Sequence, residues 1–235
     1  MAARWRGEGG QHQGGRSYQE DNWALQPLGD DALLAVIADG MGGHAGGAVA
    51  SKLVVEAFLA ALHRGLSLAE GLQEANQAVR QGSASQPELA GMGSTVVAAV
   101  VKGDEVRWIS VGDSPFYRAA GGTLERLNAD HSMAPQIDQL LERGILSAEE
   151  AAGHPGRHTL REAVMGEPLT LIDEGRQSMT PGTCLLLCSD GVHSLSDEAI
   201  AANAGGGVQD LLAAVLAVGS PHQDNVTIVK LERLS

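Results

Sequence analysis

The sequence predicts an α+β fold with antiparallel sheets, on three observations. Residues 94–114 hold two β-rich runs about the turn Lys102-Gly103-Asp104-Glu105, which is a hairpin pattern. Helical patterns follow one another in pairs, so strands and helices do not alternate singly. The 235 residues are 43% hydrophobic, which is enough to bury the core of one domain. Together these features favour an antiparallel layout over a parallel, doubly wound one.

We expect a single domain over residues 1–235. Residues 1–15 are rich in Gly and Gln without any period, which predicts a loose lead-in over residues 1–13. No long linker and no internal repeat follow. The first thirty residues lack the apolar segment of a signal peptide, and the longest apolar stretch, which contains Glu56, is short for a membrane span. We therefore expect a cytoplasmic protein, with a monomer as the default state.

The first half of the chain should contain a buried strand and two helices. The strand covers residues 31–39, and a helix over residues 48–64 follows a glycine-rich loop. A second helix should begin at Ser67, because Ser67 and Glu70 form a capping-box pattern. The apolar positions at helical spacing in these two helices are Ala50, Leu53, Ala57, Ala61, Leu68, Leu72, Ala75 and Val79.

The second half should add a flap, two strands and two helices. Residues 130–160 combine a short helical pattern with polar sequence that contains His and Gly, which suggests a mobile flap rather than core. The remaining elements are expected at residues 182–190 and 224–234 (strands) and at 197–204 and 208–218 (helices). Cys184 and Cys188 would lie on one face of a strand, as reduced core residues rather than a disulfide or a zinc pair.

Aspartates stand where predicted strands end or begin. Four of them flank four apolar runs and a fifth lies further upstream: Asp39, Asp113, Asp190, Asp224 and Asp21. Because antiparallel neighbours place the end of one strand beside the start of the next, these carboxylates could converge on one rim. Each alone could be an ordinary turn residue. However, Asp39-Gly40 and Asp190-Gly191 repeat one design, in which a strand is followed by Asp and Gly.

Such a cluster indicates a metal site for a hard cation. Carboxylates with few histidines and no useful thiols suit Mg²⁺ or Mn²⁺ rather than zinc. Glycine allows close backbone approach, so the carbonyl of Gly40 could join the ligands. The formal charge of −13 would repel nucleic acid and anionic membranes over most of the surface, and also a phosphate unless metal ions intervene.

Eight segments occur in a fixed order along the chain: GRSYQEDNW, VIADGMGGHAGG, GMGSTVVAAVV, SVGDS, DHSM, RHTLREAVMG, LLLCSDGV and DNVTIV. In this order, from about residue 14 to residue 231, the chain resembles the metal-dependent protein phosphatases of the protein phosphatase 2C family. The glycine loop has the form typical of bacterial members. The resemblance implies a four-layer α-β-β-α sandwich, in which antiparallel helix pairs flank two antiparallel sheets.

The resemblance also implies a two-metal centre of Mn²⁺ or Mg²⁺ at one end of the sandwich. The implied ligands are Asp21, Asp39, the Gly40 carbonyl, Asp190 and Asp224, with Asp113 as the ligand of a weaker third ion shared with Asp190. Two such ions lower the pKa of a bridging water, which then attacks the phosphorus in line. No protein nucleophile is needed.

Further roles are implied around this centre. Arg16 should hold the substrate phosphate, because its planar guanidinium contacts two oxygens at once. His44 is a candidate donor of the proton to the leaving oxygen, or else it orders the glycine loop. His158 is a further candidate in the flap. Asp130 and His131 belong to the DHSM block, and His131 would hold the segment 130–133 in place.

One departure from the family pattern concerns the third ion. The family often has arginine after Gly-Asp-Ser, whereas this chain has Pro115 there, with Arg118 three residues further on. The geometry at Asp113 and the ion pairing around it are therefore open, while the two-metal core is unaffected.

The implied activity is hydrolysis of phosphoserine and phosphothreonine in proteins, opposing a bacterial Ser/Thr kinase, with specificity set by residues 130–165 and the cleft rim. Three alternative functions fit the sequence less well. A phosphoprotein-binding pseudophosphatase is disfavoured because all four core aspartates are present. A nucleotide-binding glycine loop is disfavoured, because Ala45 stands where its third glycine should follow Gly40 and Gly42. A two-metal nuclease conflicts with the acidic charge, and neither nucleic acid nor a membrane is an expected partner.

Overall fold

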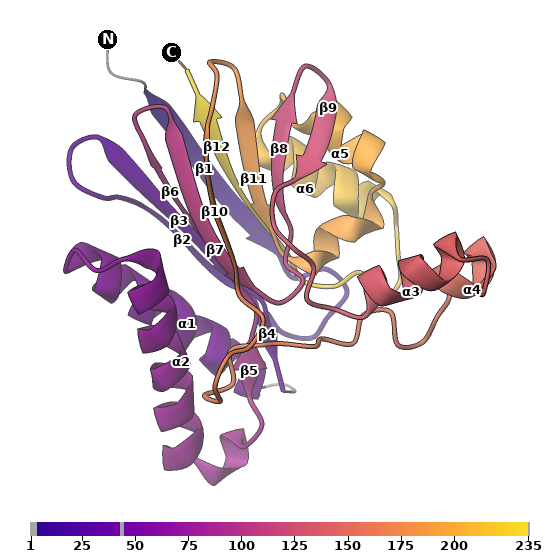
Figure 1. Ribbon diagram of the computed structural model, residues 1–235, viewed down its shortest axis with the longest axis horizontal. Helices are drawn as coiled ribbons and strands as arrows, with labels where there is room; N and C mark the ends of the chain where they lie inside the picture. Colours follow the sequence, from indigo (N-terminus) through magenta and orange to yellow (C-terminus); the bar gives the residue numbers. More distant parts are fainter. Residues whose placement is uncertain (1–3, 43–44, 235) are drawn as a thin grey trace.

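The computed structural model describes residues 4–42 and 45–234. Two five-stranded antiparallel sheets lie between layers of helices, which confirms the predicted α+β sandwich (Figure 1). Sheet A has the order β1-β12-β11-β8-β9, with β1 Trp5–His12, β8 Phe116–Ala120, β9 Thr123–Arg126, β11 Cys184–Cys188 and β12 Val226–Arg233. Sheet B has the order β10-β7-β6-β3-β2, with β2 Asn22–Pro27, β3 Ala32–Ala38, β6 Val96–Lys102, β7 Glu105–Val111 and β10 Asp173–Ser178. The short strands β4 (Gly40–Met41) and β5 (Gly93–Ser94) pair separately.

Helices cover the outer faces of the sandwich. On sheet B lie α1 (Ala45–His63) and α2 (Leu68–Ser85), followed by the 3₁₀ turn η1 (Pro87–Leu89). On sheet A lie α5 (Asp197–Asn203) and α6 (Val208–Ala217), after the 3₁₀ turn η2 (Asp190–Ser194). The apolar core has three parts: a layer between the sheets, a layer under α1 and α2 that includes Phe58, and a layer under α5 and α6 that includes Ile200.

Local sequence explains most of these boundaries. The predicted capping box of α2 is present: the Ser67 hydroxyl accepts from the amide of Glu70, and the Glu70 carboxylate accepts from the amide of Ser67 at 2.8 Å. The predicted hairpin is also present, since Lys102 pairs with Glu105 across β6 and β7. Helix α1 begins at Ala45, three residues before the expected start, so Gly46 and Gly47 belong to the helix and not to the glycine-rich loop.

The expected loose lead-in over residues 1–13 is wrong for residues 5–12, and residues 1–3 lie outside the described residues. Residues 5–12 form β1, an edge strand of sheet A that pairs along its whole length with β12. Glycine is required here by close packing of the sheets. A Cβ added to Gly9 would lie 2.2 Å from the ring of Trp23, and one added to Gly7 would lie 2.6 Å from Leu25.

The flap and the cysteines are found where the sequence placed them. Helices α3 (Ala134–Glu142) and α4 (Ala148–Ala152) project beside the sandwich and contribute few buried side chains (Figure 1). Ile145, between them, is 63% exposed. Cys184 and Cys188 are buried in the core under α5 and α6, and both are free thiols.

Within the part of the chain that the structure describes, one helix meets the length and composition of a membrane span. Helix α1 has a mean hydropathy of 1.6 over its most apolar window, half of which is buried inside the molecule. A core helix that packs on a sheet passes the same test, and α1 packs on β2 and β3.

The packing of β1 gives a testable prediction. We expect Gly9→Ala to destabilise the fold by about 1–3 kcal/mol, because the added methyl group overpacks the contact with Trp23. Urea unfolding followed by tryptophan fluorescence measures the change. Gly205→Ala is the matched control, since a Cβ there meets nothing within 4 Å. Equal midpoints for the two variants would contradict the packing of β1 described above.

Candidate active site

The strand register brings the predicted aspartates to one end of sheet B. Asn22 pairs with Ala38, so Asp21 and Asp39 lie side by side where β2 starts and β3 ends. The start of β6 and the end of β7 meet at the same end, because Val96 pairs with Val111.

Sheet A contributes its own strand ends to the same rim. The segment Gly112-Asp113-Ser114-Pro115 leads from β7 of sheet B to β8 of sheet A. Phe116, the first residue of β8, pairs with Leu187 near the end of β11. Asp190 follows β11, and Asp224 precedes β12 in the neighbouring position, so both sheets supply carboxylates.

Four of these five carboxylates line a cleft of about 600 Å³ between the ends of the two sheets, and Asp21 is buried beside Asp39. Its walls include Asp39, Gly40, Asp113, Asp190 and Asp224, and also Arg16 and His158. The sequence patterns did not single out four polar side chains that also line the cleft: Tyr18, Glu20, Thr95 and Asn225. Asn225 stands beside Asp224 in DNVTIV, so its position next to a ligand candidate was the available signal.

One carboxylate oxygen of Asp21 accepts hydrogen bonds, and the other has no partner among the described residues. Its Oδ2 accepts hydrogen bonds from the hydroxyls of Ser189 and Thr227, both at 2.7 Å. Its Oδ1 is buried and has no hydrogen-bond partner among the described residues. A buried carboxylate oxygen without a partner is costly, which indicates that a cation completes the site.

Burial and mutual repulsion shift the titration of the cluster. Burial raises the pKa of Asp21 to about 6, although hydrogen bonds from Thr227 and Ser189 lower it, and burial together with nearby carboxylates raises the pKa of Asp190 to about 7. The pKa of Asp39 is raised well above its usual range, first by burial and then by the charges of the other carboxylates.

The donor set fits hard divalent cations, although the ligands are not preassembled. Among residues 4–42 and 45–234, no group of three His, Cys, Asp or Glu side chains is already arranged to hold a metal ion. The partnerless Oδ1 of Asp21 and the mutual repulsion of the carboxylates nevertheless describe an anionic, oxygen-only site. Mg²⁺ and Mn²⁺ are the ions that such donors prefer.

Close backbone packing explains the glycines beside Asp39. A Cβ on Gly40 would lie 2.1 Å from the carbonyl oxygen of Gly47 in the first turn of α1, and 2.7 Å from the carbonyl of Glu20. The carbonyl of Asp39 accepts from the amide of Thr95 at 2.8 Å and from the hydroxyl of Ser94 at 3.0 Å. The end of β3 is therefore fixed from two sides.

Arg16 lies at the mouth of the cleft and pairs with Asp224 at 2.5 Å. Its side chain is 51% exposed, so the guanidinium has room to meet a ligand from solvent. The loop that contains it is tied down by Asn225, whose amide nitrogen donates to the carbonyls of Gln13 and Tyr18. Asn225 thus links the loop of Arg16 to the segment that contains Asp224.

Arg126 provides the local ion pairing that Pro115 cannot. Its guanidinium donates to the carbonyl of Asp113 at 2.8 Å and to the carboxylate of Asp130 at 3.1 Å. Burial and the charge of Asp130 raise the pKa of Asp113 to about 6. Arg118, the other arginine in this region, pairs instead with Glu125 on the neighbouring strand.

The histidines occupy different positions. His131 is buried, accepts from the amide of Gly112 through Nδ1 at 3.3 Å, and joins the base of the flap to the Asp113 turn. Burial lowers its pKa. His158 lines the cleft. His44 lies outside the described residues.

Comparison with known proteins gives one consistent result. The family model described as protein phosphatase 2C matches residues 8–231. The serine/threonine phosphatase stp of Listeria welshimeri is 34% identical over 193 residues, which cover 78% of this chain and 75% of that protein. The serine/threonine protein phosphatase PstP of Mycobacterium tuberculosis is 35% identical over 214 residues, which cover 84% of this chain and 40% of that longer protein.

A solved structure agrees in fold. The crystal structure of the catalytic domain of PstP in complex with two manganese ions superposes with a TM-score of 0.81 and 27% identity, and 100% of both chains is covered. The two manganese ions belong to that structure.

The carboxylate cluster predicts how stability depends on pH. Asp21, Asp113 and Asp190 have pKa values of about 6 to 7 in the folded state, above the usual 3.8, so the folded state binds more protons than the unfolded state in that range. Stability without metal should therefore fall as pH rises from about 5 to about 8. Mn²⁺ should reverse the loss, because it binds the folded state.

Thermal unfolding in EDTA and in Mn²⁺ measures both effects. Asp190→Asn should unfold at a higher temperature than the wild type in EDTA at about pH 8, by roughly 2–4 °C for each kcal/mol of repulsion removed. It should also show a smaller upward shift with Mn²⁺. A wild type that responds neither to pH nor to Mn²⁺ would contradict a repulsive metal site.

Proposed function

Because the chain belongs to the protein phosphatase 2C family, we propose that it hydrolyses phosphoserine and phosphothreonine in proteins and opposes a bacterial Ser/Thr kinase. The single observation that carries the proposal is the rim where both sheets deliver carboxylates around the partnerless oxygen of Asp21, with Arg16 at the mouth. The relatives named as serine/threonine phosphatases support the same substrate class.

Four carboxylates and one backbone carbonyl would hold the metal pair: Asp21, Asp39, the Gly40 carbonyl, Asp190 and Asp224. When bound, Mn²⁺ or Mg²⁺ supplies positive charge that lowers the pKa of a bridging water and neutralises the phosphoryl oxygens. The protein side of this chemistry is positioning. Ser189 and Thr227 orient Asp21, and Ser94 and Thr95 fix the backbone at Asp39.

Arg16 is our candidate for binding the phosphate. A planar guanidinium donates two parallel hydrogen bonds to two phosphate oxygens, which aligns the phosphorus as well as holding it. The imidazole of His158, in the cleft wall, and that of His44 are candidates for giving a proton to the leaving seryl or threonyl oxygen. Asp130 and His131 act by holding the base of the flap against the Asp113 turn: His131 accepts from the amide of Gly112, and Asp130 is linked to the carbonyl of Asp113 through Arg126.

Asp113 is proposed to hold a third, weaker ion together with Asp190. The fork of Arg126 fixes the backbone of Asp113. This contact supports a fixed turn at Asp113 although Pro115 stands where the family often has arginine. We further propose that the protein acts in the cytoplasm as a monomer, with phosphoproteins and their kinase as partners.

The activity is tested on a phosphothreonine peptide with Mn²⁺, Mg²⁺ or EDTA. We expect turnover that needs metal and that falls by about 100-fold or more in Asp190→Asn, the scale on which one removed electrostatic group acts. Asp30→Asn, at an exposed aspartate far from the cleft, is the matched control and should keep full activity.

Two results would overturn the proposal. Manganese binding seen by calorimetry without hydrolysis of any phosphopeptide would favour a phosphoprotein-binding pseudophosphatase. Metal-dependent cleavage of plasmid DNA, lost in Asp190→Asn, would favour a nuclease.

The role of Arg16 has its own prediction. Arg16→Ala should lower kcat/KM by roughly 10- to 150-fold, because hydrogen bonds to a charged group contribute about 1.5–3 kcal/mol. Arg16→Lys should recover part of the loss, since lysine keeps the charge without the fork. Arg118→Ala, which removes a pair on the β8–β9 hairpin, serves as control. Unchanged kcat/KM in Arg16→Ala would remove Arg16 from phosphate binding.

A further inference from the structure

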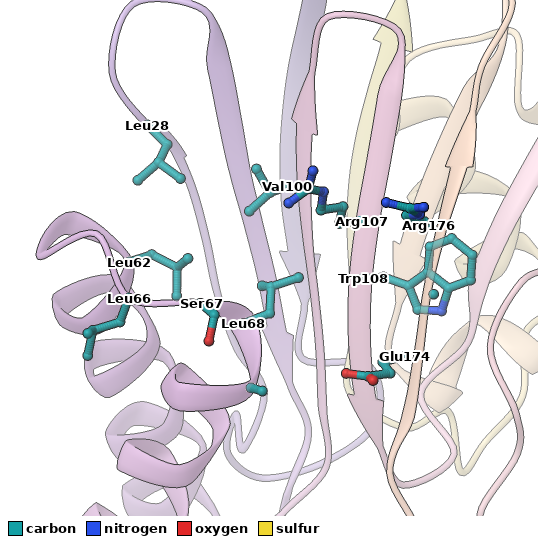
Figure 2. A pocket seen from close by; sticks show the side chains of 12 residues that line it. Leu28, Leu62, Leu66, Ser67, Leu68, Val100, Arg107, Trp108, Glu174 and Arg176 are labelled. Carbon is teal, nitrogen blue, oxygen red and sulfur yellow. The ribbon is translucent and has the colours of Figure 1, made fainter.

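A groove of about 490 Å³ lies between the α1–α2 connection and the outer face of sheet B (Figure 2). Leucines from the helices and from the end of β2 form one wall, and side chains of β7 and β10 form the other. The catalytic cleft lies elsewhere. One cross-strand row of sheet B contains Leu34, Val100, Arg107 and Arg176. On β3, Leu34 lies five residues before Asp39, which marks the cleft end of the sheet. At about 3.3 Å per residue, the row is roughly 17 Å from that end of the sheet.

The leucine wall is the uncovered margin of the helix–sheet core. Leu28, Leu66 and Leu68 are only partly buried, although they pack against the core under α1 and α2. Helix α2 contacts β7 but leaves the outer face of β10 open at its charged positions. An apolar surface that adjoins the core and remains in contact with water favours a partner that covers it.

Two arginines face each other on the opposite wall. Arg107 and Arg176 are direct cross-strand neighbours on β7 and β10, and like charges in this position destabilise a sheet. Arg107 is paired with Glu105. The side chain of Arg176 is exposed and makes no hydrogen bond or ion pair within the described ranges, while Glu174 is the one acidic side chain of the lining. In a chain of charge −13, such a pair is a local site for an anion.

The groove continues along α2 as a second hollow of about 450 Å³. The two hollows adjoin at Ala69 and Glu174, and the second is lined by Leu72, Ile109, Pro168, Leu169 and Ile172. Ile172 is 46% exposed. From Leu68 to Asn76 the helix provides about 12 Å of wall, at 1.5 Å per residue.

We propose that this groove binds an acidic, amphipathic segment of a partner protein. Two apolar side chains about two helical turns apart would occupy the two hollows, and a carboxylate would lie between Arg107 and Arg176. The length of the groove and its two apolar hollows match a short helix better than a compact ligand, which a pocket would enclose on most sides. The carboxylate would relieve the repulsion of the arginine pair.

Selection from a displayed library of random 16-residue peptides tests the proposal on the full chain. Ala69→Phe is the blocking variant, because Ala69 is exposed on α2 at the junction of the hollows, and Ala84→Phe is the matched control near the other end of α2. We expect peptides enriched in Asp, Glu and large apolar residues that bind the wild type and Ala84→Phe but not Ala69→Phe. No enrichment, or enrichment that Ala69→Phe does not affect, would overturn the proposal.

The charge is tested on one enriched peptide by fluorescence anisotropy. Arg176→Glu should weaken binding by at least about tenfold, whereas Arg4→Glu, the same change at an exposed arginine of the N-terminal segment, should stay within about twofold. Equal weakening by both would mean that only net charge matters. Two other results would overturn the proposal. Concentration-dependent dimers of the free protein that Ala69→Phe abolishes would mean that the groove binds a second copy of the chain. Tight binding of dodecanoate at the groove would mean that it binds a fatty acid.

Discussion

Carboxylates that repel one another are concentrated at one end of the sandwich, and much of the structure nearby holds them in place. The repulsion is visible in the raised pKa values of Asp39 and Asp190. Hydroxyls from β12 and from the end of β11 hold Asp21, and a side-chain amide from the same rim ties the loop of Arg16. Bound divalent cations would convert this repulsion into binding energy, which would offset the cost to the fold.

Backbone proximity is the second requirement of the same rim. Gly40 packs against the first turn of α1, and a Cβ on Gly191 would lie 2.1 Å from the carbonyl of Asn225. Both glycines directly follow an aspartate of the cluster. Each of the two Asp-Gly pairs therefore combines a proposed metal ligand with the only residue type that lets a neighbouring segment approach this closely. One pair follows β3 of sheet B and the other follows β11 of sheet A, so each sheet contributes one Asp-Gly pair to the rim.

The features predicted well from the sequence are those that neighbouring residues encode. Strand ends followed by Asp, the capping box at Ser67 and the two-residue turn after Lys102 all depend on local order. By contrast, β1 was missed because its glycines resemble a loose segment, whereas they reflect the ring of Trp23 on another strand. Strand β10 has no apolar run at all, so its pairing with β7, and with it the arginine pair of the groove, could come only from tertiary context.

The place of β12 in sheet A has a consequence for synthesis of the protein. β12 lies between β1 and β11, yet it is formed by residues 226–233, far along the chain from β1. Until these residues have been made, β1 has no strand to pair with, and Thr227 and Asp224 are not yet in place beside Asp21. Contacts between segments so far apart in the sequence also form slowly. During synthesis, the rim of carboxylates is therefore completed only after β12 has paired with β1 and β11.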